Sequence, residues 1–240
     1  MSVTMDNIYA ATDATWPPAR VWQDGPLTLR EGQGGGGRVS SATQDQPVTD
    51  ADITNAEQAM RALGQVPRFQ IRNGHDALDA LLDARGYEVL DETVIYVAPI
   101  DMLTDIAIPR VTTFCVWEPL AIMNEIWAKG GIGPARLNIM ARAKTKTGIL
   151  SRWNEKPAGV AFAGLHDRIC MVHAVEVLPH QRRMGVAVWM MRQAAFWGQS
   201  QGADTIALMT TRANAGANAL YAGLGFSEIG GYHYRHLPKG

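Results

Sequence analysis

The sequence predicts an α/β (α+β) fold with a mixed, mostly antiparallel twisted sheet flanked by helices. Short runs rich in Val, Ile and aromatic residues alternate with stretches that carry apolar residues at helical spacing. In the second half of the chain, several strand runs come first, and a long helix pattern, a strand, a short helix and a last strand follow. A sheet with one crossover helix accounts for this order.

Length and composition suggest two folded modules. The chain has 240 residues, of which 47% are hydrophobic and 19% are charged. A chain of this length can hold two cores, so we expect the modules 1–109 and 110–240. The formal net charge of -1 provides no long-range field for nucleic acid or an anionic membrane.

The sequence contains few features that indicate the cellular compartment of the protein. Cys115 and Cys170 are the two cysteines of the sequence, and two cysteines form no disulfide framework, which favours the cytoplasm. The first residues lack the basic region and apolar core of a signal peptide. The most apolar helical stretch, Gly185–Gly198, is too short to span a membrane.

The first half of the chain reads as strands and helices bounded by turn residues. Pro26–Arg30 has a strand pattern, and the glycine-rich tract Gly32–Gly37 is expected to return the chain as a hairpin to Arg38–Ser40. A phosphate-binding loop is the alternative for this tract, but it lacks the Lys-Ser/Thr ending and the strand-to-helix context. The other expected elements are the helix Asp52–Leu63, the strand Phe69–Arg72, the helix Asp76–Ala84 and the strand Glu88–Ala98.

The second half is expected to start near Arg110 and to contain more strands than helices. The expected strands are Val111–Trp117, Leu137–Ala141, Thr147–Trp153, Ala158–Leu165, Ile169–Val177, Thr205–Thr210 and a final strand pair or ribbon over Phe226–His236. The expected helices are Leu120–Trp127, Gly185–Gln201 and Asn218–Leu224.

An internal repeat relates the ends of the two halves. An offset of 139 positions lays Gly86 on Gly225 and Tyr87 on Phe226. Both copies read as strand, polar turn, short helix, glycine, aromatic residue and strand. Coincidence is the alternative, since a helix ended by glycine is common. The strands before the helices fall at nearly the same offset, so we predict two related modules.

The segment from Val177 to Ala187 carries the strongest local signal. Arg182, Gly185 and Ala187 follow the pattern Arg-x-x-Gly-x-Ala where a strand turns into a helix. Backbone N–H groups at such a helix start point outward and suit a pyrophosphate, and Arg183 adds further positive charge. The alternative is a solvated turn before an ordinary helix, and the spacing alone does not exclude it.

A second signature follows between Asn214 and Phe226, in the pattern Asn-x-x-Ala-x-x-Leu-Tyr-x-x-x-Gly-Phe. The two signatures, joined by a helix and a strand, resemble the acetyl-CoA signature and the second signature of the GCN5-related N-acetyltransferase (GNAT) superfamily. The resemblance covers about Leu137 to His236. It departs at Ala187, where many members have glycine. It implies a tandem arrangement with a catalytic second module.

The resemblance implies acetyl-CoA as the cosubstrate and assigns residues to it. The backbone N–H groups from Arg182 to Val186 are expected to hold the CoA pyrophosphate. The strand end Ala174–Val177 is expected to splay from the Thr205–Thr210 strand and to pair with the pantetheine arm, and Tyr221 to face the sulfur. The full expected set for the cofactor is Ala174, Val175, Val177, Arg182, Arg183, Met184, Gly185, Val186, Ala187, Asn214 and Tyr221.

Direct transfer to an amine in a ternary complex needs a base and a proton donor. A lysine-like amine has a pKa of about 10.4, so only about one in a thousand is neutral near pH 7.4. Two candidates for the base, Glu176 and His173, lie on one strand. On a regular strand they face opposite sides, and a bulge would change that parity. A rim carboxylate and a satisfied core histidine are the alternatives; Glu176 is placed first. Tyr221 keeps its proton at neutral pH and can supply it to the leaving thiolate.

The first half lacks both signals. It has no Arg-x-x-Gly-x-Gly/Ala pattern at a helix start, and the offset places Leu82 where Tyr221 stands. We therefore expect a degenerate acetyltransferase-like module that covers the active half and shapes the acceptor pocket. His166, Cys170 and His173 have a spacing that suggests a metal site, but residues 170 and 173 of a strand face opposite sides and no fourth ligand follows, so we expect no metal.

These observations predict an acetyl-CoA-dependent N-acetyltransferase. The acceptor is expected to be a small-molecule amine or a peptide N-terminus, with no nucleic acid or membrane as partner. The alternative is a catalytically inert acyl-CoA-binding or regulatory protein, against which the presence of Tyr221 argues. The identity of the acceptor, the length of the acyl chain and the oligomeric state do not follow from the sequence.

Overall fold

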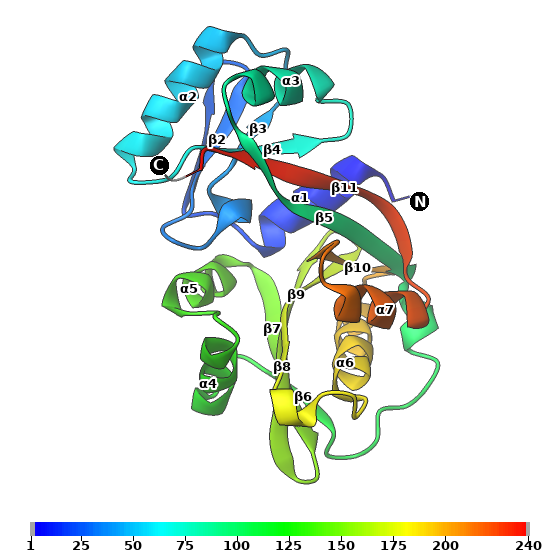
Figure 1. Cartoon of the computed structure of the whole chain (residues 1–240). Helices are drawn as coiled ribbons and strands as arrows, with labels where there is room; N and C mark the ends of the chain where they lie inside the picture. The colour runs from blue at the N-terminus through cyan, green and yellow to red at the C-terminus, as the bar shows by residue number, and fades with distance from the viewer. Residues whose placement is uncertain (1–2, 239–240) are drawn as a thin grey trace. The chain divides into compact units, whose positions relative to one another are not determined.

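The computed structural model describes residues 3–238, which form two compact units (Figure 1). The first unit contains the described residues up to Pro17, together with Ile95–Met209 and Ala215–Ile229. The second contains Pro18–Val94, Thr210–Asn214 and the described residues from Gly230 onward. The units are therefore not two consecutive stretches of chain. A division at residue 109 into a degenerate and a catalytic module stays a prediction.

The first unit is built around a mixed sheet. Its strands follow the order β10 (Thr205–Thr211), β9 (Ile169–Val177), β8 (Lys156–His166), β7 (Thr145–Trp153) and β6 (Thr113–Val116), with the end of β5 (Glu88–Pro99) beside β10. Neighbours from β6 to β9 are antiparallel, whereas β9 and β10 are parallel. The helices of this unit are α1 (Met5–Thr15), α4 (Ala121–Lys129), α5 (Pro134–Arg142), α6 (Val186–Ser200) and α7 (Ala215–Gly223), with short 3-10 turns at Ile100–Leu103 and Pro179–Gln181.

Helices cover both faces of this sheet (Figure 1). On one face, α6 packs so closely that a Cβ on Gly159 would lie 3.0 Å from Cγ1 of Val186. On the other face, α1 packs against β8, where a Cβ on Gly164 would lie 2.7 Å from Cβ of Thr15. Gly159 and Gly164 are an odd number of positions apart on one strand and so face opposite sides. Glycine at these two positions lets each helix lie directly on the strand.

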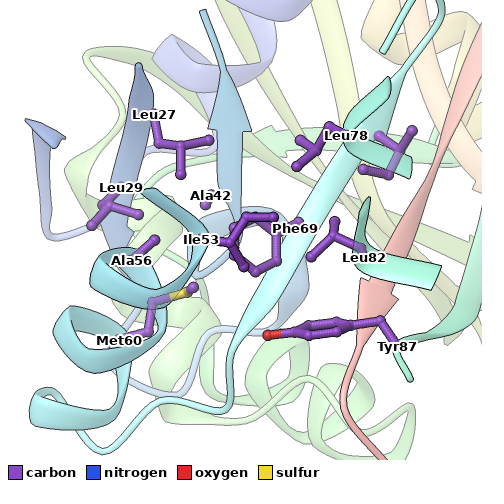
Figure 2. Packing of buried hydrophobic residues seen from close by; sticks show 11 residues of the cluster. Leu27, Leu29, Ala42, Ile53, Ala56, Met60, Phe69, Leu78, Leu82 and Tyr87 are labelled. Carbon is purple, nitrogen blue, oxygen red and sulfur yellow. The ribbon is translucent and has the colours of Figure 1, made fainter. Parts of the chain in front are cut away.

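The second unit has its own sheet and core. Its strands follow the order β1 (Arg20–Asp24), β2 (Leu27–Glu31), β3 (Ala42–Gln44), β4 (Arg68–Arg72) and β11 (Ser227–His236), next to the start of β5. Two helices, α2 (Asp50–Ala62) and α3 (Asp76–Ala84), pack on it. Figure 2 shows Ile53 and Met60 of α2 and Leu82 of α3 converging on Phe69 of β4. All four side chains are fully buried, so the apolar face of each helix forms the core.

The two copies of the predicted repeat have the same local geometry. Helices α3 and α7 span residues that are 139 positions apart at both ends. The N–H of Tyr87 donates to the carbonyl of Leu82 at 3.0 Å, and the N–H of Phe226 donates to the carbonyl of Tyr221 at 3.0 Å. Each copy is also preceded by a parallel strand pair joined by a helix, β3-α2-β4 in one and β9-α6-β10 in the other. The same αβ plan is therefore used twice.

The last strand of each repeat copy lies beside a strand of the other copy. Strand β11 ends the second copy, yet it runs antiparallel to β4 from Tyr232 opposite Arg72 to His236 opposite Arg68. Strand β5 ends the first copy, yet its end lies beside β10. This exchange explains why each compact unit draws on both halves of the sequence.

Most of the predicted elements are present, and the fold class is confirmed. The strand expected at Leu137–Ala141 is wrong, because these residues lie in α5. Pro134 occupies the first turn of α5, where its missing N–H leaves no hydrogen bond unmade. The neighbours Ile139 and Met140 are both buried, which a helix permits and an alternating strand does not.

Three further differences concern strands and the N-terminus. The return strand of the first hairpin is Ala42–Gln44 rather than Arg38–Ser40, because Gly37–Val39 forms a 3-10 turn. The ribbon expected at the C-terminal end is the single strand β11. Neither α1 nor β1 was predicted. None of the helices in residues 3–238 combines the length and apolar character that crossing a bilayer requires.

Candidate active site

The turn before α6 presents a bare helix start. Gly185 is the N-cap of α6, with φ of 76° in the left-handed region, and no side chain caps the helix. The first intrahelical bond runs from the N–H of Trp189 to the carbonyl of Gly185 at 3.2 Å. The N–H groups of Val186 and Ala187 thus have no acceptor within the helix. Such a start can accept an anion on its backbone N–H groups.

Positive charge and strain accompany this turn. Arg182, Arg183 and Met184 are exposed. Arg183 has φ of 65°, a conformation that costs energy in a residue with a side chain and is often found at functional sites. Nε of Arg182 donates to the carbonyl of Val177 at 3.3 Å, which ties the turn back to the end of β9. The predicted pyrophosphate residues thus share one exposed, basic turn.

Strands β9 and β10 pair over only part of their length. The pairing runs from Thr205 opposite Ile169 to Leu208 opposite Val172, and in the described chain it goes no further. Strand β9 nevertheless continues to Val177. Its last residues, which include Ala174, Val175 and Val177 of the predicted cofactor set, therefore lie beyond the pairing with β10. Amide groups of a linear ligand can pair with such a strand end.

A β-bulge in β9 decides which way the two candidate bases face. His173 lies opposite Phe162 of β8 and Glu176 lies opposite Val160, so β9 has one residue more than β8 over this stretch. Ala174, inside the bulge, has φ of 52°. Phe162 and Val160 are two positions apart and share a face, and directly opposite residues share a face as well. His173 and Glu176 therefore lie on the same face, whereas a regular strand would separate them.

Glu176 lies in a half-buried place at the end of α4. A Cβ on Gly130 would lie 2.3 Å from Cδ of Glu176, so the carboxylate rests directly over that glycine. Burial raises the pKa of Glu176, although the nearby Arg182 and Arg136 act in the opposite direction. A carboxylate with a raised pKa is a better proton acceptor than an exposed one. This environment supports Glu176 as the base.

His173 is packed and hydrogen-bonded instead. It is 5% exposed, and its Nε2 lies 2.8 Å from Oγ1 of Thr15. The Thr15 hydroxyl donates to the carbonyl of Ala11 at 2.6 Å, so Nε2 of His173 is the donor to Thr15. The ring lies 5.0 Å from Trp16 and 6.1 Å from Phe162, measured between centroids. These contacts favour the interpretation of His173 as a satisfied core histidine.

Tyr221 is the buried aromatic residue of α7. It is 6% exposed, and its ring centroid lies 5.9 Å from that of Tyr96 and 5.8 Å from that of Phe226. Burial raises the pKa of Tyr221 to about 12. The phenol therefore keeps its proton at neutral pH, as a donor to a thiolate must.

Asn214 lies immediately before α7, and it is exposed. It belongs to the second compact unit, so its contact with the cofactor stays a prediction. Within residues 3–238, no group of three or more His, Cys, Asp or Glu side chains is arranged to hold a metal ion.

Sequence reasoning missed three residues around the bulge of β9: Thr15, Trp127 and Gly130. Each touches β9 from an element distant in sequence, α1 or the end of α4. No spacing rule connects such positions. Trp127 carried the one usable signal, since a fully buried tryptophan needs a partner for its N–H.

Comparison with known proteins identifies the family of this region. Residues 120–226 match the family model of the acetyltransferase (GNAT) family. Over these residues the chain is similar to the GNAT family. The match begins at residue 120, earlier than the resemblance seen in the sequence, and so includes α4 and α5. It ends at the aromatic residue that closes the second signature, Phe226.

Similar proteins extend over nearly the whole chain. The uncharacterized N-acetyltransferase YobR of Bacillus subtilis is 27% identical over 238 residues, which cover 92% of this chain and 94% of YobR. A GCN5-related N-acetyltransferase from Kribbella flavida has the same fold, with a TM-score of 0.72 and 19% identity over 97% of this chain and 95% of its own. A tandem GNAT protein from the clavulanic acid biosynthesis pathway matches 98% of this chain and 89% of its own, with a TM-score of 0.60 and 12% identity. The GNAT fold thus accounts for both halves of the chain.

Proposed function

We propose that this GNAT protein transfers an acetyl group from acetyl-CoA to an amine acceptor by direct attack in a ternary complex. The observation that carries the proposal is the uncapped start of α6 at the left-handed Gly185, which follows a strand end that β10 leaves unpaired. One feature suits a pyrophosphate and the other suits a chain of amides. Together they match the two ends of the CoA arm.

The turn holds the phosphates in this proposal. The N–H groups from Arg183 to Val186 point to the pyrophosphate, whereas the N–H of Arg182, also expected there, already donates to the carbonyl of Pro179 at 3.4 Å. The side chains of Arg182 and Arg183 add positive charge beside the positive end of the helix dipole. Small residues at positions 185 and 187 leave the backbone accessible. The strand end Ala174–Val177 pairs with the pantetheine arm.

Two side chains move the protons. The amine nitrogen forms a bond to the acetyl carbon while the bond between that carbon and sulfur breaks. Glu176, directly or through a water, accepts the proton that the amine gives up, and its raised pKa improves it as a base. Tyr221 gives its proton to the departing thiolate, which is more basic than the thioester sulfur.

The second unit supports a single site for CoA. Its corresponding helix, α2, begins with a capping box in which Oγ1 of Thr49 accepts from the N–H of Asp52 and Oδ2 of Asp52 accepts from the N–H of Thr49 at 2.8 Å. Asp50 adds another acidic group to this first turn. The helix start is thus already occupied and negatively charged. Leu82, at the position that corresponds to Tyr221, is fully buried in the core and offers no proton.

Turnover of acetyl-CoA tests the proposal. Thiol release is followed against a panel of small-molecule amines, amino acids, polyamines and N-terminal peptides, with longer acyl-CoA donors in parallel. We expect acetyl-CoA to react with at least one amine class. Tight CoA binding without turnover by any acceptor would instead identify the chain as an acyl-CoA-binding protein.

A further inference from the structure

The bulge of β9 interrupts its regular pairing with β8 at Ala174 and Val175. Between His173 and Glu176, β9 has the additional residue, and Ala174 leaves the extended conformation with φ of 52°. A buried carbonyl without a partner destabilises the conformation that contains it. A donor from outside the sheet can stabilise such a bulge by pairing with one of its carbonyls.

Trp127 supplies that donor. Its Nε1 donates to the carbonyl of Ala174 at 2.9 Å, and its side chain is fully buried. The contact bridges residues that are 47 positions apart. The indole N–H of tryptophan can only donate a hydrogen bond, so in this contact Trp127 is the donor and the carbonyl of Ala174 is the acceptor.

Gly130, three residues after Trp127, makes room for Glu176. It is the C-cap of α4, with φ of −85°, a conformation that any residue adopts. Glycine is needed here for space, because a Cβ would lie 2.3 Å from Cδ and 2.6 Å from Oε2 of Glu176. These are distances that non-bonded atoms do not reach. Any side chain at position 130 must displace the carboxylate.

We propose that the last turn of α4 positions the base, with Trp127 holding the bulge and Gly130 leaving the space in which the Glu176 carboxylate lies. This inference rests on the proposed function, in which Glu176 accepts the proton. Trp127 and Gly130 are positioning residues, because each acts through β9 or Glu176. The charged groups that face the carboxylate are Arg136 of α5 and Arg182 of the turn before α6.

Gly130→Ala is the sharpest variant. Position 130 is exposed and its φ accepts alanine, so the protein should fold. We expect kcat to fall by about 5- to 50-fold while CoA affinity, measured by calorimetry, changes by less than about twofold. The acid limb of kcat/KM should move to lower pH, because a displaced carboxylate is better solvated. Gly133→Ala is the matched control, since a Cβ there meets no atom within 4 Å and its φ is −93°.

Trp127→Phe removes the donor and keeps an aromatic ring in place. It should lower kcat with the same shift of the acid limb. The decisive measurement places Gly130→Ala in a Glu176→Gln background, where it should change kcat by less than about twofold, because no base remains to be positioned.

Two results would overturn the inference. The first is a parental kcat in Gly130→Ala while Glu176→Gln loses most of its activity. The second is a double variant in which the fold-losses of kcat from the two single variants multiply. Parental turnover in Glu176→Gln is a different outcome. It rejects the base assigned under the proposed function, and with it the residue that α4 would position.

Discussion

Tyr221 carries its proton at neutral pH because burial raises its pKa to about 12. Replacing it by phenylalanine keeps the ring that packs against Tyr96 and Phe226 and removes only the hydroxyl. We expect kcat of Tyr221→Phe to fall by about 10- to 1,000-fold, with little change in CoA affinity. Steady-state kinetics and calorimetry on the same protein measure the two quantities.

The neighbouring Tyr96 offers a matched control. Its hydroxyl donates to Oδ1 of Asn218 at 3.1 Å, so Tyr96→Phe also deletes one hydroxyl from the same aromatic cluster. It should leave kcat within about threefold of the parent, because no proton passes through it. Equal losses in both variants would assign Tyr221 to packing.

Glu176→Gln should lower activity and raise stability at neutral pH. The pKa of Glu176 is raised in the folded protein, so the folded state disfavours the ionised form, and this destabilisation grows as pH rises above the ordinary carboxyl pKa of about 4.3. We expect Glu176→Gln to unfold at a higher temperature than the parent at pH 7.5. The difference should vanish at low pH, where the parent carboxyl is protonated in both states. Thermal melts at the two pH values check the sign.

The same substitution should remove the acid limb of the pH profile. In the parent protein, kcat/KM should fall as pH drops through a value above the ordinary carboxyl pKa, because Glu176 becomes protonated and stops accepting protons. An unchanged acid limb in Glu176→Gln would assign that limb to another group.

At the scale of elements, the helices α6 and α2 start differently. The start of α6 has no side-chain cap and can bind an anion, whereas the start of α2 is capped and acidic and cannot. Gly185→Val should weaken CoA binding by at least tenfold, about 1.4 kcal/mol, because valine blocks the approach to the backbone and resists a φ of 76°. Isothermal calorimetry with CoA measures the change.

Gly202 provides the control for the backbone strain that a valine introduces at a positive φ. It follows the other end of α6, has φ of 93°, and a Cβ there meets no atom within 4 Å. Gly202→Val therefore introduces a similar conformational strain away from the turn. Its CoA affinity should stay near the parental value, and a loss equal to that of Gly185→Val would point to general strain rather than a blocked site.

At the scale of the whole molecule, we expect one CoA per chain. The first turn of α2 is closed by the capping box of Thr49 and Asp52, and its acidic groups repel a phosphate. Titration of the folded chain should saturate near one equivalent. Substituting Arg182, Arg183 and Gly185 together should abolish binding, and a second equivalent that survives this change would show a working site in the N-terminal half.

The exchange of strands makes a further whole-molecule prediction. A fragment of residues 110–240 lacks α1 and the end of β5, both of which belong to the first compact unit. It should therefore expose apolar surface at β8 and at the edge of β10, and show no cooperative thermal unfolding transition. A sharp transition in circular dichroism would show that the second half folds by itself.

The sequence by itself determined most of the elements and the family. Hydrophobic periodicity marked α3 at Asp76–Ala84 and β9 at Ile169–Val177 to the residue, because one buried face per element imposes a regular pattern. The pattern Arg-x-x-Gly-x-Ala marked Gly185 as a small residue at the start of a helix, and the structure gives it a φ of 76°. Two signatures at a fixed spacing predicted the GNAT family, which the match over residues 120–226 bears out.

Only the tertiary structure decided on which face of the sheet Glu176 lies and which segments of the chain form each compact unit. A bulge changes which side the following residues face without leaving a pattern in the strand, since the two residues in it, Ala174 and Val175, are ordinary strand residues. Its donor, Trp127, comes from a helix 47 residues away. The exchange of β5 and β11 depends on which strand edges meet in space. Local sequence encodes the period of an element, whereas long-range packing chooses its partner.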